Sequence, residues 1–197
     1  MFTIEKLDMR VKYTREWIFE ALSKLLESKQ YDEIKITEII NKAGISRATF
    51  YRNFSTKDDI VKLKVKMFFE SFSLDVINHY KHFDHTDESF IIKSFFNSID
   101  EEEKLISTVI KTKLEYLMEQ GILRIINIQK EQFYKLVKTN ENIDKYTMEI
   151  VASSAWTLLS RWIKNGKLET ASELVDIYFA TFKSVYIALF GDKADLL

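Results

Sequence analysis

The sequence predicts an all-α protein, and three observations support that fold class. Apolar residues recur at the three- and four-residue spacing of helices along almost the whole chain. The 197 residues include no proline and only four glycines, so the usual turn residues between short strands are scarce. A strand-like run bounded by turn residues is also missing from the sequence. A protein of long helices joined by few tight turns follows.

The helices can be placed in order from this spacing. A first helix is expected over about residues 11–29, with an apolar inner face made of Trp17, Ile18, Ala21, Leu22 and Leu25. Two short helices follow, and Ser55 is then expected to cap a long helix from about residue 56 to the low eighties. Its inner face is predicted to hold Ile60, Leu63, Val65, Met67 and Phe68. Further helices are expected near 87–99, 101–111, 112–138, 143–165 and 170–190.

Residues 35–57, KITEIINKAGISRATFYRNFSTK, have the features of a helix-turn-helix. Thr37 is expected to cap the first short helix, because its hydroxyl can accept a hydrogen bond from a free N–H of the first turn. Gly44 follows, where a left-handed backbone is least costly without a Cβ. Ser46 can cap the second short helix, with Phe50 as an inward anchor. In proteins built this way the second helix enters the major groove of DNA.

The order of residue types in this segment resembles the tetracycline-repressor (TetR) family of bacterial transcription regulators. The shared pattern consists of Ile36-Thr37, Ile39, Ala43-Gly44, Ser46, Thr49-Phe50-Tyr51, Phe54 and Lys57. The resemblance extends back through WIFEALSKLLESKQYDEIKITEII and covers about residues 10–65. Gln30 and Ile40 depart from the family pattern, in which glycine and alanine are usual. The resemblance implies a three-helix DNA-binding domain at residues 1–56 and a helical regulatory and dimerisation domain at 57–197.

The resemblance implies DNA-contact roles for seven residues of the helix-turn-helix, namely Thr37, Ser46, Arg47, Ala48, Thr49, Tyr51 and Lys57. Arg47 would reach either a guanine edge, in a bidentate contact, or a phosphate. Ala48 and the methyl group of Thr49 suit a thymine methyl group. The second short helix is therefore expected to read base edges from its first turn.

The other expected contacts are to phosphates, which position the protein on DNA without reading sequence. Thr37 and Tyr51 match family positions that hydrogen-bond phosphates. Lys57 matches a lysine whose ammonium, together with free N–H groups at a helix start, binds phosphate. Each has a structural alternative: Tyr51 as half-buried packing, Lys57 as a solvated surface charge, and Ser46 as a cap alone.

The charge distribution agrees with a localised DNA-binding face. Residues 35–57 contain five basic residues and one acidic residue, a local net charge of +4. The whole chain carries −1, so the remainder sums to −5. Neutralised phosphates release counterions, and that release drives DNA binding. Arg10, Lys12 and Arg15 extend the basic patch, either as contacts to the DNA backbone or as a solvated arm.

The last two helices, from about residue 148 to 190, are expected to form a homodimer. VASSAWTLLSRWI presents small residues beside large apolar ones, and LVDIYFATFKSVYIALF is apolar on nearly all sides. In the resembled family these helices pair across a two-fold axis, and this region loosely resembles the branch of dihydroxyacetone-kinase regulators. A helix buried within one monomer is the alternative. A dimer would read a near-palindromic operator in double-stranded DNA.

Other function classes have little support in the sequence. The chain has no cysteine, which excludes disulfides and thiol catalysis, and no apolar run long enough to span a membrane. We expect a cytoplasmic protein that is not an enzyme and needs no cofactor. The residue types of His79, His82 and His85 suit zinc or nickel, but a polar helix end and loop is the preferred explanation, so no metal site is predicted.

Residues 90–135 mix aromatic side chains with charges, and the resembled family often has a small-molecule pocket in this region. Ordinary core packing is the alternative, and no pocket residue can be named from the sequence. The function predicted is a DNA-binding transcriptional regulator, a repressor released by a small-molecule or protein signal. Two alternatives stay open: a helix-turn-helix coactivator that works through a protein partner, and a metal sensor that uses the three histidines.

Overall fold

The computed structural model describes residues 9–82, 88–133 and 141–190, and these ranges are helical throughout apart from short connections. No strand occurs in them, so the all-α prediction is confirmed. The elements are α1 (Met9–Leu25), the short 3₁₀ helix η1 (Tyr31–Glu33), α2 (Ile36–Ala43), α3 (Arg47–Asn53), α4 (Lys57–His82), α5 (Glu88–Glu101), α6 (Glu103–Lys111), α7 (Tyr116–Phe133), α8 (Glu141–Lys164) and α9 (Ala171–Phe190).

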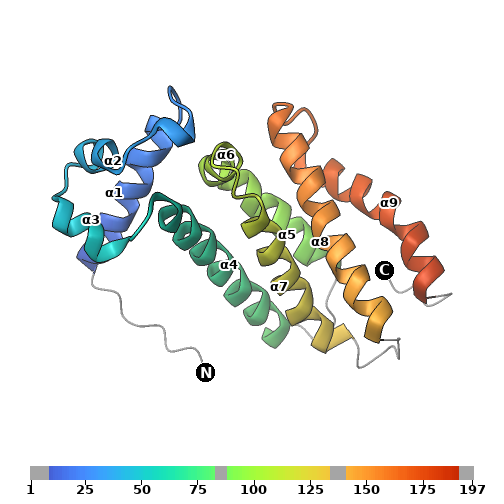
Figure 1. Ribbon diagram of the computed structural model, residues 1–197. Coiled ribbons are helices and arrows are strands. Elements are labelled where there is room, and N and C mark those ends of the chain that lie inside the picture. Colours follow the sequence, from blue (N-terminus) through green and yellow to red (C-terminus); the bar gives the residue numbers. More distant parts are fainter. Residues whose placement is uncertain (1–8, 83–87, 134–140, 191–197) are drawn as a thin grey trace.

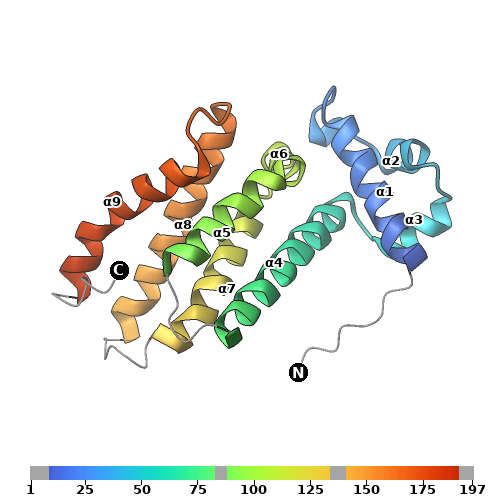
Figure 2. The same ribbon diagram turned by 180° about the vertical axis from the view of Figure 1, so that it is seen from behind.

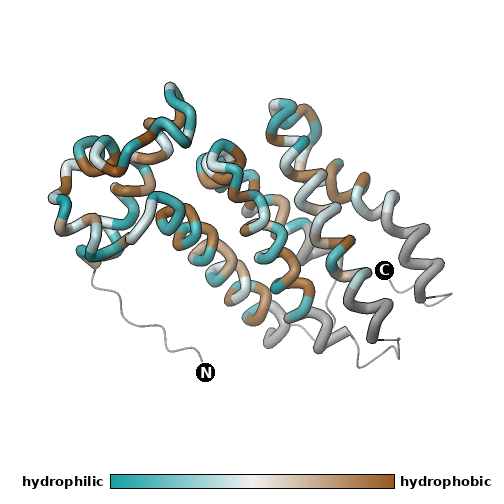
Figure 3. Tube along the Cα trace, in the orientation of Figure 1, coloured by the Kyte–Doolittle hydropathy of each residue, from teal (hydrophilic) through white to brown (hydrophobic). Residues whose placement is uncertain are grey.

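The molecule consists of a three-helix head, α1 to α3, and a helical body, α4 to α9 (Figure 1). The head lies at one end of the molecule and α9 lies farthest from it, a separation that is also clear from behind (Figure 2). Helices α4, α7 and α8 follow one another side by side, while α5 packs against α9. Apolar and polar residues alternate along the coloured parts of the helices (Figure 3), as expected for helices with one face in the core and one in solvent.

Helix α4 joins the head to the body. Its buried residues recur at helical spacing, from Ile60 and Val61 near the head to Phe72 and Val76 far inside the body. It contacts α1 in the head and α5, α6 and α7 in the body. The predicted domain boundary at residue 56 falls directly before α4. The boundary stays a prediction, because α4 packs against both the head and the body.

Two predicted helix caps are wrong. Thr37 does not cap α2, because that helix begins at Ile36 and the capping residue is Lys35, whose N–H donates to the Glu38 carboxylate at 3.0 Å. Ser55 does not cap α4 either. The Thr56 hydroxyl accepts from the N–H of Asp59 at 3.3 Å, and the Asp59 carboxylate accepts from the N–H of Thr56 at 2.8 Å. In both helices, the carboxylate of the third helical residue accepts a hydrogen bond from the N–H of the residue that precedes the helix.

Trp17 is also placed differently from the prediction. It was expected on the inner face of the first helix, but 57% of its surface is exposed. The buried face of α1 is instead formed by Ile18, Phe19, Ala21 and Leu22. Helix α1 contacts α2, α3 and α4, and Trp17 lies outside the face that α1 buries.

Candidate nucleic-acid interface

The turn between α2 and α3 depends on Gly44. Its backbone is left-handed, with φ at 67°, a conformation that costs residues with a Cβ about 1–2 kcal/mol. The Gly44 N–H donates to the Asn41 carbonyl at 3.2 Å, and the Ile45 N–H donates to the Ile40 carbonyl at 3.2 Å. These bonds satisfy carbonyls that the end of α2 leaves free. The chain can therefore reverse into α3 within three residues, as predicted.

Helix α3 is a short helix, capped at its start and anchored on one side. The Ser46 hydroxyl accepts from the Thr49 N–H at 3.0 Å, so the predicted N-cap is confirmed. Phe50 is fully buried and Phe54 is 5% exposed, with their ring centroids 6.0 Å apart. Both act as core anchors, as expected. The opposite side of the helix is left facing outward.

The outward side of α3 carries four exposed residues: Arg47, Ala48, Tyr51 and Arg52. The Arg47 guanidinium carbon lies 5.5 Å from the centroid of the Tyr51 ring, within range of a cation–π contact. The Tyr51 ring rests edge-on against Phe50 and is 47% exposed. Tyr51 is therefore packed at its base while its outer part is accessible, and two cations stand on the same exposed side.

Thr49 and Thr37, two further predicted contacts, differ in how accessible they are. Thr37 is exposed near the start of α2. Thr49 is half-buried, and its hydroxyl pairs with that of Ser46 at 2.8 Å. Its oxygen also lies 3.5 Å from an Arg52 guanidinium nitrogen. The hydroxyl of Thr49 therefore has partners inside the head, and its predicted contact with DNA rests on the methyl group.

Lys57 contacts the head itself. Its ammonium donates to the carbonyl oxygens of Tyr31 at 2.6 Å and Ile34 at 3.0 Å, and it lies 4.1 Å from the centroid of the Tyr31 ring. An ammonium has three N–H donors, so these bonds occupy most of its capacity. The solvated surface charge considered as an alternative does not describe this half-buried lysine. The phosphate contact stays a prediction.

Two ion-paired or hydrogen-bonded acids lie close to this surface. Glu38, the one acidic residue of segment 35–57, pairs with Lys29, and the hydrogen bond from Lys29 lowers the pKa of Glu38 below its ordinary value. Asp58 accepts from the Tyr31 hydroxyl. Burial first, and then this bond, raise the pKa of Tyr31 well above its ordinary value, so the hydroxyl stays protonated. The carboxylates of Glu38 and Asp58 are thus each paired with a residue of the head, Lys29 and Tyr31.

Asn53 and Arg15 form a contact that the sequence did not indicate. The Arg15 Nε donates to Asn53 Oδ1 at 3.2 Å, and Asn53 Nδ2 donates to the Thr49 carbonyl at 2.9 Å. Arg15 is separated from Asn53 by 38 positions. Only its place in a basic cluster could have pointed to it, and nothing in the spacing indicated its partner.

Aromatic rings of α4 and α5 pack together in the described part of the body, the region where the resemblance implied a small-molecule site. Phe69 and Phe95 stack with centroids 6.1 Å apart, and Phe72 meets Phe95 edge-on at 5.2 Å. Gly121 on α7 admits the Phe69 ring, since a Cβ there would lie 2.0 Å from it. Two surface hollows of about 330 Å³ and 310 Å³ lie elsewhere, one between α1 and α6 and one beside α3.

The metal-sensor alternative falls mostly outside the described residues. His85 is not described, and of His79 and His82 only the helical backbone is. Among the described residues, no group of three histidine or acidic side chains is arranged to hold a metal ion. No helix among the described residues is long and apolar enough to cross a membrane.

Comparison with known proteins agrees with this geometry. The model of the TetR family of bacterial regulatory proteins matches residues 18–63. The uncharacterized HTH-type transcriptional regulator YxbF of Bacillus subtilis (strain 168) is 35% identical over 63 residues. That match covers 32% of this chain and 17% of YxbF, so the chain matches only a small part of this relative.

Solved structures share the fold over nearly the whole chain. Lin0861 of Listeria innocua has a TM-score of 0.74 and 16% identity, covering 92% of this chain and 95% of that protein. A TetR transcriptional regulator of Streptococcus agalactiae 2603V has a TM-score of 0.63 and 16% identity, covering 88% and 96%.

The dihydroxyacetone-kinase branch is also represented. The dihydroxyacetone kinase operon activator DhaS has a TM-score of 0.57 and 18% identity, covering 87% of this chain and 97% of DhaS. The predicted resemblance of the C-terminal region to this branch is therefore confirmed at the level of fold. Residues 18–63 match the TetR family of bacterial regulatory proteins, and the chain shares the all-helical fold of a solved TetR transcriptional regulator.

Proposed function

We propose that this protein is a DNA-binding transcriptional regulator that inserts α3 into the major groove of an operator. One observation carries the proposal. A capped helix, held from behind by Phe50 and set by the left-handed turn at Gly44, turns two arginines and a tyrosine to solvent. A short helix presented in this way is the recognition helix of a helix-turn-helix.

The proposed roles follow from accessibility and chemistry. Arg47, in the exposed first turn of α3, binds a guanine edge or a phosphate. Ala48 and the Thr49 methyl group contact thymine methyl groups. Tyr51 donates its hydroxyl to a phosphate, a contact that fixes the depth of the helix in the groove.

The remaining predicted contacts are peripheral to α3. Thr37 near the start of α2 and Ser46 at the cap of α3 are proposed to bind phosphates through hydroxyl or backbone N–H groups. Lys57 contributes a positive charge near the backbone, with the N–H that its two carbonyl partners leave over. These residues set the register of the protein rather than its sequence preference.

The proposed dimer uses the outward faces of α8 and α9. On α8 the exposed residues at helical spacing are Ile150, Ser153, Thr157 and Arg161, and on α9 they are Glu173, Ile177, Ala180 and Thr181. Both faces combine an isoleucine with small residues, which lets helices approach closely, and they carry opposite charges. A two-fold axis would bring the combined α8–α9 face against its copy. Two recognition helices would then read a near-palindromic operator.

We further propose that the protein represses transcription in the cytoplasm and that a small molecule or a protein releases it. Helix α4 links head and body, so a signal that moves α4 would change the spacing of the two heads in a dimer. A second candidate is a coactivator that acts through a protein partner. It is favoured by the fold shared with an operon activator and by the ring-filled body core.

The proposal is tested by binding the purified protein to the DNA that flanks its own gene, at two salt concentrations with unrelated DNA as competitor. We expect tight binding that resists competition. Arg47→Ala and Tyr51→Phe should each weaken it about tenfold. Lys66→Ala is the matched control, because Lys66 lies on an exposed side of α4 in the body.

Unchanged affinity in both α3 variants would contradict the recognition-helix assignment. Wild-type binding that vanishes with salt would leave only general attraction to phosphates. That result would favour the coactivator, which predicts binding to a second regulator instead.

A further inference from the structure

Arg15 is held against the far end of the recognition helix. Its Nε donates to Asn53 Oδ1, and Asn53 in turn donates to the Thr49 carbonyl one turn back in α3. The second bond fixes which way the Asn53 amide faces, so its oxygen is available to Arg15. A residue of α1 is thereby oriented by a residue of α3.

This contact leaves most of the guanidinium available. Arginine carries N–H donors on Nε and on both Nη atoms, and the bond to Asn53 uses only the one on Nε. Arg15 borders the hollow of about 310 Å³ beside α3, with Arg52 and the hydroxyl-bearing residues Tyr51 and Ser55 also on its lining. Two guanidinium groups and two hydroxyl groups therefore meet at one accessible depression.

One acid, Asp59, also lines this hollow. Its carboxylate already accepts from the backbone N–H groups of Ser55 at 3.1 Å and Thr56 at 2.8 Å, and Lys62 lies 3.6 Å from it. Its charge is thus engaged by donors at the start of α4. The excess of donors over free acceptors in the hollow favours an anion.

We propose that the hollow beside α3 is an additional phosphate-binding site for the DNA backbone, with Arg15 as the phosphate ligand and Asn53 as its positioning residue. This inference rests on the proposed function. A planar guanidinium whose two Nη groups are not used by the bond to Asn53 matches the oxygens of a phosphodiester. The site would add a phosphate contact from α1 near the C-terminal end of α3. The proposed base contacts lie at the other end of α3, in its first turn.

The geometry also determines what the site contributes. Phosphate contacts carry no base preference, so Arg15 adds affinity for any duplex and fixes the angle of α3 in the groove. Each neutralised phosphate changes the slope of log K against log salt by about 0.9. That slope distinguishes a phosphate ligand from a residue that merely ties α1 to α3.

The experiment measures duplex binding by Arg15→Ala, Arg15→Lys and Asn53→Ala over a series of salt concentrations. Arg15→Ala should weaken binding about tenfold and make the negative slope shallower by about 0.9. Arg15→Lys and Asn53→Ala keep the charge and lose the orientation, so they should weaken binding about threefold and leave the slope nearly unchanged. Lys24→Ala is the control, because Lys24 is an exposed cation in the last turn of α1.

Thermal unfolding of each variant separates folding from binding. If the Arg15→Ala variant is folded and its slope of log K against log salt is unchanged, the proposal is overturned. The contact between Arg15 and Asn53 would then be purely structural. The series is run on both the operator candidate and unrelated duplex DNA. If wild type shows no specific operator, the proposed function fails, while the slope on unrelated DNA still decides the role of Arg15.

Discussion

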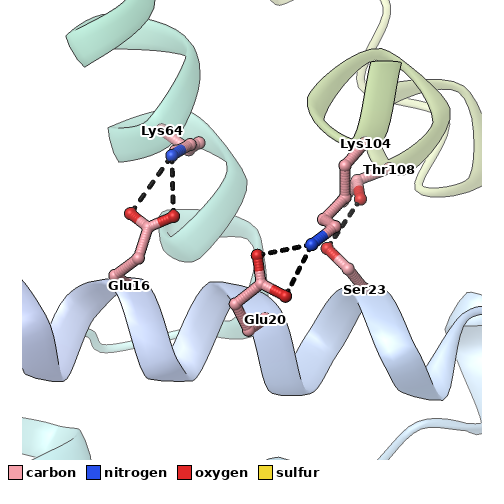
Figure 4. Close-up of polar contacts among 6 residues, drawn as sticks. All are labelled: Glu16, Glu20, Ser23, Lys64, Lys104 and Thr108. Carbon is pink, nitrogen blue, oxygen red and sulfur yellow. Dashed lines mark hydrogen bonds and ion pairs between the residues drawn. The ribbon is translucent and has the colours of Figure 1, made fainter. Parts of the chain in front are cut away.

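Ser23 on α1 and Thr108 on α6 share a buried hydrogen bond of 2.9 Å between their hydroxyl groups, which ties the head to the body (Figure 4). The residues lie 85 positions apart in the sequence. Nearby, Lys104 donates to both carboxylate oxygens of Glu20 at 2.7 Å, and Lys64 on α4 pairs with Glu16. Polar contacts along one side of α1 thus join the head to the body, beside a hydrophobic core that is continuous between them.

Removing one partner of the buried pair should cost more than removing both. We expect Ser23→Ala or Thr108→Val alone to lower the free energy of unfolding by about 1–3 kcal/mol, because the other hydroxyl loses its partner. The double variant should cost less than the sum of the two. Urea unfolding of all four proteins checks this, and strictly additive losses would mean that the hydroxyls do not interact.

Gly121→Ala should destabilise the body. A Cβ at this position would lie 2.0 Å from the Phe69 ring, which cannot move freely because Phe68 and Phe95 pack beside it. Overpacking of this kind costs about 1–3 kcal/mol in the free energy of unfolding. Adding Phe69→Leu should relieve part of that loss, so the double variant should be more stable than the two single losses predict. If Phe69→Leu gives no such relief, the contact with the Phe69 ring is not the cause of the destabilisation.

The cap of α4 gives a pH-dependent prediction. Burial alone would raise the pKa of Asp59, but the N–H groups of Thr56 and Ser55 and the Thr56 hydroxyl together lower it below its ordinary value of 3.8. A lowered folded-state pKa stabilises the protein above pH 3.8, and this contribution disappears as pH falls through the folded-state value.

We therefore expect Asp59→Ala to cost about 1 kcal/mol at neutral pH, a typical value for a lost cap. The difference from wild type should shrink as pH falls below 3.8 and through the lower folded-state pKa, where the wild-type carboxylate becomes protonated. Asp59→Asn is the non-titrating control. Thermal unfolding between pH 7 and pH 3 measures this, and a difference that stays constant over that range would rule out the charged cap.

Lys57 allows its structural and DNA-binding roles to be separated. We expect Lys57→Met to lower the free energy of unfolding by about 1–3 kcal/mol, because the carbonyl groups of Tyr31 and Ile34 lose their donor. If Lys57 also contacts a phosphate, Lys57→Met should in addition make the negative slope of log K for DNA binding against log salt shallower by about 0.9. Unfolding and salt titration of the same variant report both quantities. Wild-type stability would contradict the structural role.

The proposed dimer is tested on the exposed face of α9. Ile177→Glu places a charge on the two-fold face and should raise the dimer dissociation constant at least tenfold, because a buried charge without a partner is costly. Leu74→Glu is the matched control, since Leu74 is similarly exposed but lies on α4. Sedimentation at several protein concentrations gives the constants. Equal effects of both changes would argue against this face.

Much of the head could be predicted from local pattern. Gly44 and Ser46 were placed correctly, because a left-handed turn and an N-cap depend on residues within three or four positions. Phe50 was correctly assigned to the core for the same reason. The cap at Thr37 was wrong because two local solutions compete, and the Glu38 carboxylate reaches the preceding N–H instead.

Contacts between distant residues were beyond the sequence. Trp17 fits an apolar stripe on α1, yet whether it is buried depends on which side α4 and α6 cover. Lys57 was expected to face DNA, and its contacts are with carbonyl groups 23 and 26 positions away. The orientation of Arg15 depends on Asn53 in another helix. Spacing along the chain carries no information about such partners.

By itself the sequence determined the helical class, the position of the helix-turn-helix and the family resemblance. All three rest on short-range periodicity and on residues with special backbone or capping chemistry. The tertiary structure alone decided which polar groups of the head are already paired, where rings fill the body and how α1 meets α6. Those outcomes depend on packing between segments far apart in the chain. The free energy of such packing depends on how two surfaces fit each other, and neither segment's sequence determines that fit alone.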